Sequence, residues 1–87
     1  MLFIILAKFR QKPTKELLAE SQKLFEKEKK EGIKYLGMYY TLGRYDGVSI
    51  MEAPDEKTVM KAAMRRGFLT SETLVAVPAE EARKLIE

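Results

Sequence analysis

The sequence predicts a single small α+β domain, and three observations point to it. The chain has 87 residues, of which 46% are hydrophobic, which suits one core and leaves no room for a second. Its apolar residues switch several times between the two-residue period of strands and the 3.6-residue period of helices. Glycine or proline stands at most of these switches, where the chain is expected to turn. We therefore treat residues 1–87 as one domain.

The first segment, Leu2–Phe9, is predicted to be a central strand because it carries apolar side chains on both faces. From Pro13 onward the period becomes that of an amphipathic helix, with the proline in its first turn and Gly32 at its end. One carboxylate falls on the apolar stripe of this helix. The stripe consists of Leu17, Leu18, Ser21, Leu24, Phe25 and Glu28.

The middle of the chain is predicted to form an antiparallel hairpin. Ile33–Leu42 and Val48–Ala53 are rich in β-branched and aromatic residues, and a short polar connection with glycine separates them. Gly37 lies inside the first of these strands and indicates a bulge or a close approach of another group.

A second helix is expected after the hairpin, with Asp55 as its N-cap. Arg65 and Arg66 would complement the carboxyl end of the helix dipole, and Gly67 would stop the helix.

The last two elements are a strand and a short helix. The strand covers Thr73–Val77 and begins near Thr70, and Pro78 opens the helix Ala79–Ile86. The resulting order, β-α-β-β-α-β with a terminal helix, predicts a ferredoxin-like sandwich with four antiparallel strands and both main helices on one face.

This topology leaves one face of the sheet without a cover. Two helices can cover only one face, whereas the first strand is apolar on both. A bare apolar sheet face is unusual on a monomer, so we expect a homodimer that pairs through the sheet faces, with a higher oligomer also compatible. The alternative is that the terminal helix folds over the open face.

Composition excludes several kinds of site. The chain has no cysteine and no histidine, which excludes disulfides, the commonest zinc and haem ligation, and Cys–His or Ser–His–Asp nucleophiles. Its carboxylates are not clustered at metal-ligand spacing, and it has no glycine-rich phosphate loop. We therefore expect neither a metal nor a cofactor.

The charge pattern argues against nucleic acid as a partner. The formal charge is +3, but the basic and acidic residues between Lys8 and Lys34 are interleaved, as on a solvated helix face. The hairpin strand Tyr45–Glu52 also lacks the basic and aromatic pattern with which such sheets stack RNA bases.

No targeting or membrane segment is expected. The apolar opening, Leu2–Ala7, lacks a basic region before it and is too short to span a bilayer, so we expect a cytoplasmic protein. The abundance of lysine and glutamate, with no asparagine, cysteine, histidine or tryptophan, is a bias shared with proteins of hyperthermophiles.

Two stretches resemble the GYD domain family. Leu42–Asp55, which reads LGRYDGVSIMEAPD, is similar to the signature of that family, and Gly67–Val77 carries Glu72-Thr73-Leu74 in the order that the family shows before its C-terminal helix. The resemblance implies a dimeric α+β barrel and a family of largely unknown function.

Five side chains are candidates for contact with a small-molecule ligand. Tyr45 and Asp46 could share a proton at a cavity mouth, although turn chemistry also explains them. Glu52 and Glu72 would make an acid–base pair if both faced one cavity, and otherwise are solvated strand-end carboxylates. Tyr39 could hold a flat aromatic molecule, or pack in the core or interface.

Two functions follow from these observations. The first is a small-molecule-binding or structural module that assembles through its sheet and performs no reaction. The second is a cofactor-independent oxygenase or isomerase that acts on a small aromatic or quinone-like compound between the sheet and the helices, and it rests on analogy with other dimeric α+β barrels.

Overall fold

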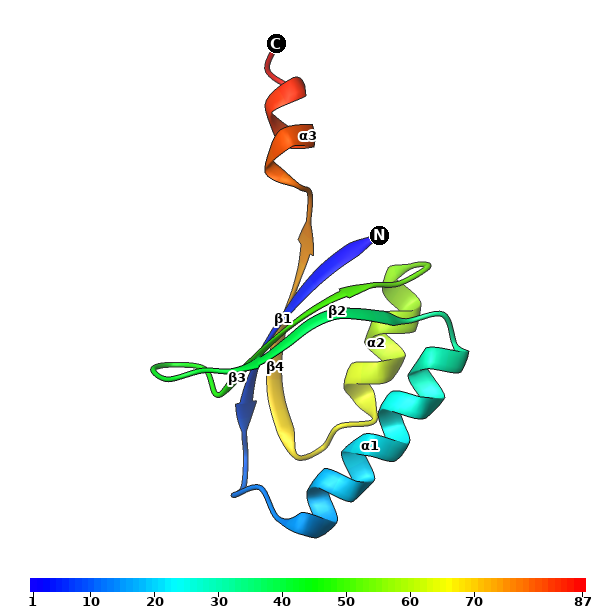
Figure 1. Cartoon of the computed structure of the whole chain (residues 1–87), viewed down its shortest axis with the longest axis vertical. Helices are drawn as coiled ribbons and strands as arrows, with labels where there is room; N and C mark the ends of the chain where they lie inside the picture. Colours follow the sequence, from blue (N-terminus) through cyan, green and yellow to red (C-terminus); the bar gives the residue numbers. More distant parts are fainter.

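The computed structural model describes all 87 residues and confirms the ferredoxin-like order of elements (Figure 1). The four strands form one antiparallel sheet in the order β2-β3-β1-β4. The elements are β1 (Leu2–Phe9), α1 (Lys15–Lys30), β2 (Lys34–Tyr40), β3 (Gly47–Glu52), α2 (Glu56–Met64), β4 (Leu69–Ala76) and α3 (Ala79–Lys84).

The strand register assigns each side chain to one of two sheet faces. Phe3 of β1 is paired with Met51 of β3, and both are buried beneath α1 and α2. Ile4, the next residue, is paired with Ile50 on one side and with Leu74 on the other. Because successive side chains of a strand point to opposite faces, this second row lies on the face that has no helices. We call it the open face.

The core lies between the helices and the sheet and is thin. Only 8 of the 87 residues are buried. The central cluster joins β1, β3 and α2 with the segments next to them. It comprises Phe3, Ile33, Met51, Ala53, Val59 and Ala62.

The start of α1 differs from the prediction. Thr14 is the N-cap, and its hydroxyl accepts a hydrogen bond from the Leu17 amide at 3.1 Å. Pro13 therefore precedes the helix and does not occupy its first turn, because a threonine side chain satisfies a free amide and proline has no side-chain acceptor. The end of α1 follows the prediction, with Gly32 in the left-handed region at φ 95°.

The ends of α2 confirm one expectation and correct another. The carboxylate of Asp55, the N-cap, accepts hydrogen bonds from the Thr58 amide and hydroxyl, both at 2.8 Å. The helix already ends at Met64, and Gly67 is not in the left-handed region, so it does not act as the glycine cap we expected. Arg65 and Arg66 bind carboxylates of α1 and of the residue that follows it, and Arg66 also donates to the Ala62 carbonyl near the carboxyl end of α2.

Gly37 lies at the predicted bulge. The register of β2 against β3 shifts between Tyr35 and Gly37. A Cβ atom at Gly37 would lie 2.9 Å from the Tyr39 ring, so the tyrosine occupies the space that the glycine leaves free.

The terminal helix does not cover the open face. α3 has no buried residue and extends beyond the end of β4, away from the sheet (Figure 1). Leu85 and Ile86 are 80% and 88% exposed. The prediction that the terminal helix folds over the open face is therefore wrong, because α3 continues the direction of β4 and does not turn back over the sheet. None of the helices combines the length and apolar composition needed to cross a bilayer.

Two glycines with positive φ allow a test of backbone strain. Gly43→Ala should lower the free energy of unfolding by about 1–2 kcal/mol, because an L-residue is disfavoured at φ 101°. Gly32→Ala should cost more, since its new Cβ would also lie 3.0 Å from the Pro54 Cγ atom, whereas Gly43 has no atom within 4 Å. Urea unfolding of both variants measures the difference. Equal losses of unfolding free energy in the two variants would show that the contact with Pro54 adds no cost to Gly32→Ala.

Candidate functional site

A cavity of about 340 Å³ lies between α1 and the helix-covered face of the sheet. Its walls come from β1, β2, β3, β4, both main helices and the segments that join them. Several of its lining residues are exposed to solvent, among them Met38 and Leu18 at 48% and Tyr40 at 77%. It is therefore a cleft between the two layers that side chains leave unfilled.

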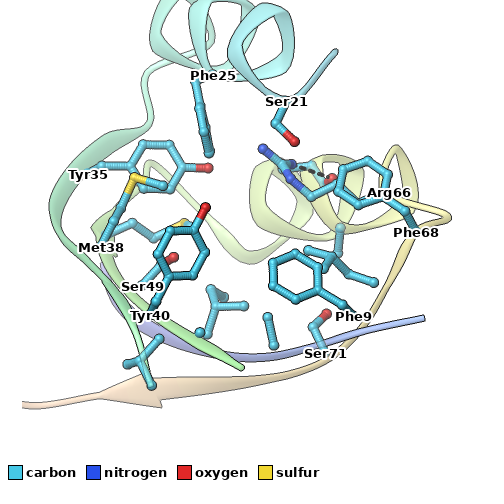
Figure 2. Close-up of a pocket in the computed structure, with 18 of the residues that line it drawn as sticks. Phe9, Ser21, Phe25, Tyr35, Met38, Tyr40, Ser49, Arg66, Phe68 and Ser71 are labelled. Carbon is cyan, nitrogen blue, oxygen red and sulfur yellow. Dashed lines mark hydrogen bonds between the residues drawn. The ribbon is translucent and has the colours of Figure 1, made fainter. Parts of the chain in front are cut away.

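Aromatic side chains dominate the wall of this cleft. Of the four phenylalanines and four tyrosines in the chain, six contribute to it. Rings from β1, α1, β2 and the loop before β4 surround a common space (Figure 2). Five of them are Phe9, Phe25, Tyr35, Tyr40 and Phe68. The sixth, Tyr39, is paired with Val48 and therefore directs its ring to the open face.

One wall carries a buried polar cluster of Glu28, Tyr35 and Arg66. The carboxylate of Glu28 is fully buried, at 0% exposure, and accepts a hydrogen bond from the Tyr35 hydroxyl at 2.7 Å. Arg66 donates to both oxygens of that carboxylate, at 2.7 Å from Nη2 to Oε1 and through Nη1 to Oε2. Nη1 also donates to the Ala62 carbonyl at 2.9 Å.

Elements far apart in the sequence bring this cluster together. Glu28 comes from the last turns of α1, Tyr35 from the start of β2, and Arg66 from the loop after α2. The Arg66 guanidinium lies 5.3 Å from the centre of the Phe25 ring, which packs edge-on against Tyr35 at 5.1 Å. The cluster therefore joins both helices to the sheet.

The local environment alters two of these groups. Burial, together with the hydrogen bond to Glu28, raises the pKa of Tyr35 well above its usual value. Burial alone would lower the pKa of Arg66, but the hydrogen bonds to Glu28 raise it instead. The tyrosine is therefore held neutral and the arginine charged, so this wall offers hydrogen-bond donors and a net charge near zero.

A second ion pair lies next to the first. Glu31 accepts bonds from Arg65 Nη1 and Nη2 at 2.5 and 2.8 Å, and the Lys61 ammonium lies 3.0 Å from it. These bonds, from Arg65 first and Lys61 second, lower the pKa of Glu31 to about 2. Successive arginines after α2 thus bind carboxylates about one turn apart at the end of α1.

The candidates from the sequence lie mostly outside the cleft. Glu52 is paired with Leu2, and Glu72 with Leu6, so the two carboxylates lie on the open face, four residues apart along β1. Tyr39 borders the cleft, but it is paired with Val48, so its ring lies on the open face, where it covers Gly37.

The structure brings one candidate pair together. Tyr45, in the β2–β3 loop, lies beside Glu72, whose carboxylate raises the pKa of the Tyr45 phenol through a hydrogen bond. Asp46 has a structural contact, because its carboxylate accepts a hydrogen bond from the Phe9 amide at 2.8 Å. It thereby fixes the hairpin loop to the end of β1.

Sequence reasoning missed Glu28 and Arg66 as members of one site. A carboxylate on an apolar helical stripe was the available signal, since such a group needs a partner when it is buried. The partner of Glu28 could not be identified from the sequence, because Arg66 is 38 residues away. The position of Arg66 after a predicted helix was also already explained by the helix dipole.

The geometry defines a class of protein: a ferredoxin-like domain with an aromatic cleft and an uncovered sheet face. The chain belongs to the GYD domain family, whose model matches residues 3–86. It is also similar to a protein of Thermus thermophilus named "Glutamine synthetase and cystathionine beta-lyase binding protein". The two are 36% identical over 59 residues, which is 64% of this chain and 62% of the relative. The match thus spans less than two thirds of the relative's length.

The buried ion pair should stabilise the fold as a unit. Glu28→Met or Arg66→Met alone leaves one buried charge unpaired and should lower the free energy of unfolding by about 3–5 kcal/mol. The double variant should lose less than the sum of the two. Urea unfolding of the four proteins gives the coupling, with Tyr35→Phe as a milder variant that retains the ion pair. Additive losses would show that the two groups act independently.

The Glu31 carboxylate should make stability depend on acid pH. Its pKa is about 2 in the folded chain against an ordinary value of 4.5, so its contribution is complete above pH 4.5 and is lost as the pH falls toward 2. The difference in unfolding free energy between the wild type and Glu31→Gln should therefore shrink over that range. Urea unfolding at a series of pH values measures it, and a difference that does not change with pH would contradict this assignment.

Proposed function

We propose that this protein is a binding module that pairs with a second copy through the open face and, in that form, binds a metabolic enzyme. The observation that carries the proposal is the uncovered apolar row on the open face. Ile4, Ile50 and Leu74 lie side by side across three strands, and Leu74 is 45% exposed. Water contact with such a row is unfavourable, and binding of another surface removes it.

A second copy suits this face because the face can match itself. Two sheets that pack face to face about a two-fold axis interdigitate their side chains across about 10 Å. Leu6 and Val48 extend the apolar row toward one end of the sheet. Lys34 and Glu52, paired in register at the other end, place opposite charges at the rim, where they favour one orientation. An interface of standard size would bury about 800 Å² on each copy.

Among the five candidates, the open-face side chains are then partner contacts. Glu52 and Glu72 lie on this face, and Tyr45 is held beside Glu72. A phenol and a carboxylate at the rim of an apolar patch are typical of the polar edge of an interface. This use of the three residues requires no catalysis.

The enzyme partner is proposed from the relative. That protein is named for binding glutamine synthetase and cystathionine beta-lyase. The apolar arm after β4 supports a protein partner here as well, because Val77, Leu85 and Ile86 are all more than half exposed. The chain thus presents apolar side chains on surfaces other than the open face.

Substitution at the centre of the open face tests the proposal. Wild-type protein should have twice its chain mass of 10.0 kDa by size exclusion with light scattering. It should also bind glutamine synthetase or cystathionine beta-lyase purified from the same organism, as measured by biolayer interferometry. Ile50→Lys should give a monomer, because it places a charge in the apolar row, and should weaken enzyme binding at least tenfold.

Met60→Lys is the matched control. It adds the same charge on α2 at a residue that is 60% exposed, and it should change neither mass nor binding. Wild-type protein that remains a monomer at micromolar concentration would contradict the homodimer. A dimer that binds neither enzyme would contradict the enzyme partner and leave the homodimer standing.

A further inference from the structure

We propose that the cleft between α1 and the sheet is a binding site for a small, neutral, ring-shaped molecule that carries a hydrogen-bond acceptor oxygen. The site is separate from the open face and does not depend on the function proposed above. Its residues are those of the cleft wall and the polar cluster at its end.

The size of the cleft indicates a small organic ligand. Protein interiors are packed closely, and unfilled apolar space costs free energy because the lining atoms lose contacts. An apolar cavity of about 150 Å³ can hold benzene. The volume here, about 340 Å³, therefore accommodates a molecule of two fused rings and lies within the range of small-molecule sites.

The walls indicate a flat ligand. Phe9, Phe25, Tyr40 and Phe68 direct their rings toward one space from several elements (Figure 2). Aromatic rings bind other rings by offset stacking and edge-to-face contact. Tyr40 is the most exposed of these rings, at 77%, so we place the entrance of the cleft beside it.

Arg66 indicates the polar group of the ligand. A guanidinium has five N–H donors. Three of those on Arg66 are used, two by Glu28 and one by the Ala62 carbonyl, which leaves two free on a side chain that lines the cleft. A carbonyl, ether or hydroxyl oxygen can accept from them.

The charge of the ligand follows from Glu28. Its carboxylate already neutralises Arg66, so a second anion would bring a like charge close to a buried carboxylate, and a cation would meet the guanidinium. A neutral molecule meets neither penalty. Ser21, Ser49 and Ser71 add hydroxyl groups around the same space, and none of them is hydrogen-bonded to another residue of the wall (Figure 2).

The test uses 1-tetralone, a neutral two-ring ketone, with tetralin as the matched probe without oxygen. Titration into ¹⁵N-labelled protein should shift the amide signals of Ser21, Ser49 and Phe68 in a saturable way, with a sub-millimolar dissociation constant. Tetralin should bind at least fivefold more weakly, because it cannot accept from Arg66. The mass of the protein by light scattering should be the same with and without the probe, so this result is independent of the open face.

A substitution that fills the cleft gives the decisive comparison. Ser21→Leu should weaken tetralone binding at least tenfold, whereas Lys23→Leu, an exposed position on the same helix, should not. If Ser21→Leu does not fold, Tyr40→Ala at the mouth replaces it and should weaken binding at least threefold.

Three results of the titrations would overturn the proposal. They are the absence of saturable shifts, shifts confined to the open face, and unchanged binding in the cleft variant. Nuclear Overhauser contacts from Leu85 or Ile86 to Phe68 without added ligand would also overturn it, since the arm of a second copy would then occupy the cleft.

Discussion

The bond between the Glu28 carboxylate and the Arg66 guanidinium is the interaction on which the two-layer arrangement depends. Few side chains are buried, and the two main helices bury only Leu17, Glu28, Val59 and Ala62 between them. With so little apolar contact, a buried, charge-assisted pair that spans both helices and the sheet has a large share in their relative position. Removal of either partner would leave a buried charge unpaired, which is far more costly than the net contribution of the intact pair.

The same pair allows the cleft to exist. Glu28 and Arg66 join the helices at the polar end of the cleft, and aromatic side chains from α1, β1 and β2 surround the space beside this pair. A better-filled core would give a more stable domain without this space. The chain therefore keeps two apolar surfaces that its own residues do not cover, one inside the sandwich and one outside it.

The order of strands and helices could be predicted from the sequence because each element is indicated by residues close together in the chain. The predicted bounds of β1, Leu2–Phe9, agree with the structure, and Asp55 and Gly32 act at helix ends as expected. Pro13 and Gly67 were misassigned because the helix ends fall at other nearby residues, with Thr14 as the N-cap of α1 and Arg65 as the C-cap of α2. Such competition between neighbours is decided by backbone angles that composition does not reveal.

The candidate site was less accessible to prediction for a different reason. The contacts of Glu28 with Arg66, and of Tyr45 with Glu72, join residues whose proximity depends on how helices and hairpin pack. Periodicity gives the face of an element and not the depth of a residue or its partner across layers. Glu52 of β3 and Glu72 of β4 illustrate this. Both lie on the open face, but Glu52 is paired with Leu2 and Glu72 with Leu6, so the two carboxylates are four residues apart along β1.

The extension of α3 from the sheet has a consequence for how the chain unfolds. A helix of six residues is marginal in water, and none of its side chains is buried against the body. Its helix–coil equilibrium is therefore uncoupled from the cooperative unfolding of the sheet, and its amide hydrogens exchange at low protection. Trypsin would cleave after Arg83 or Lys84 while the sandwich stays intact, so the arm behaves as a separate folding unit until another surface orders it.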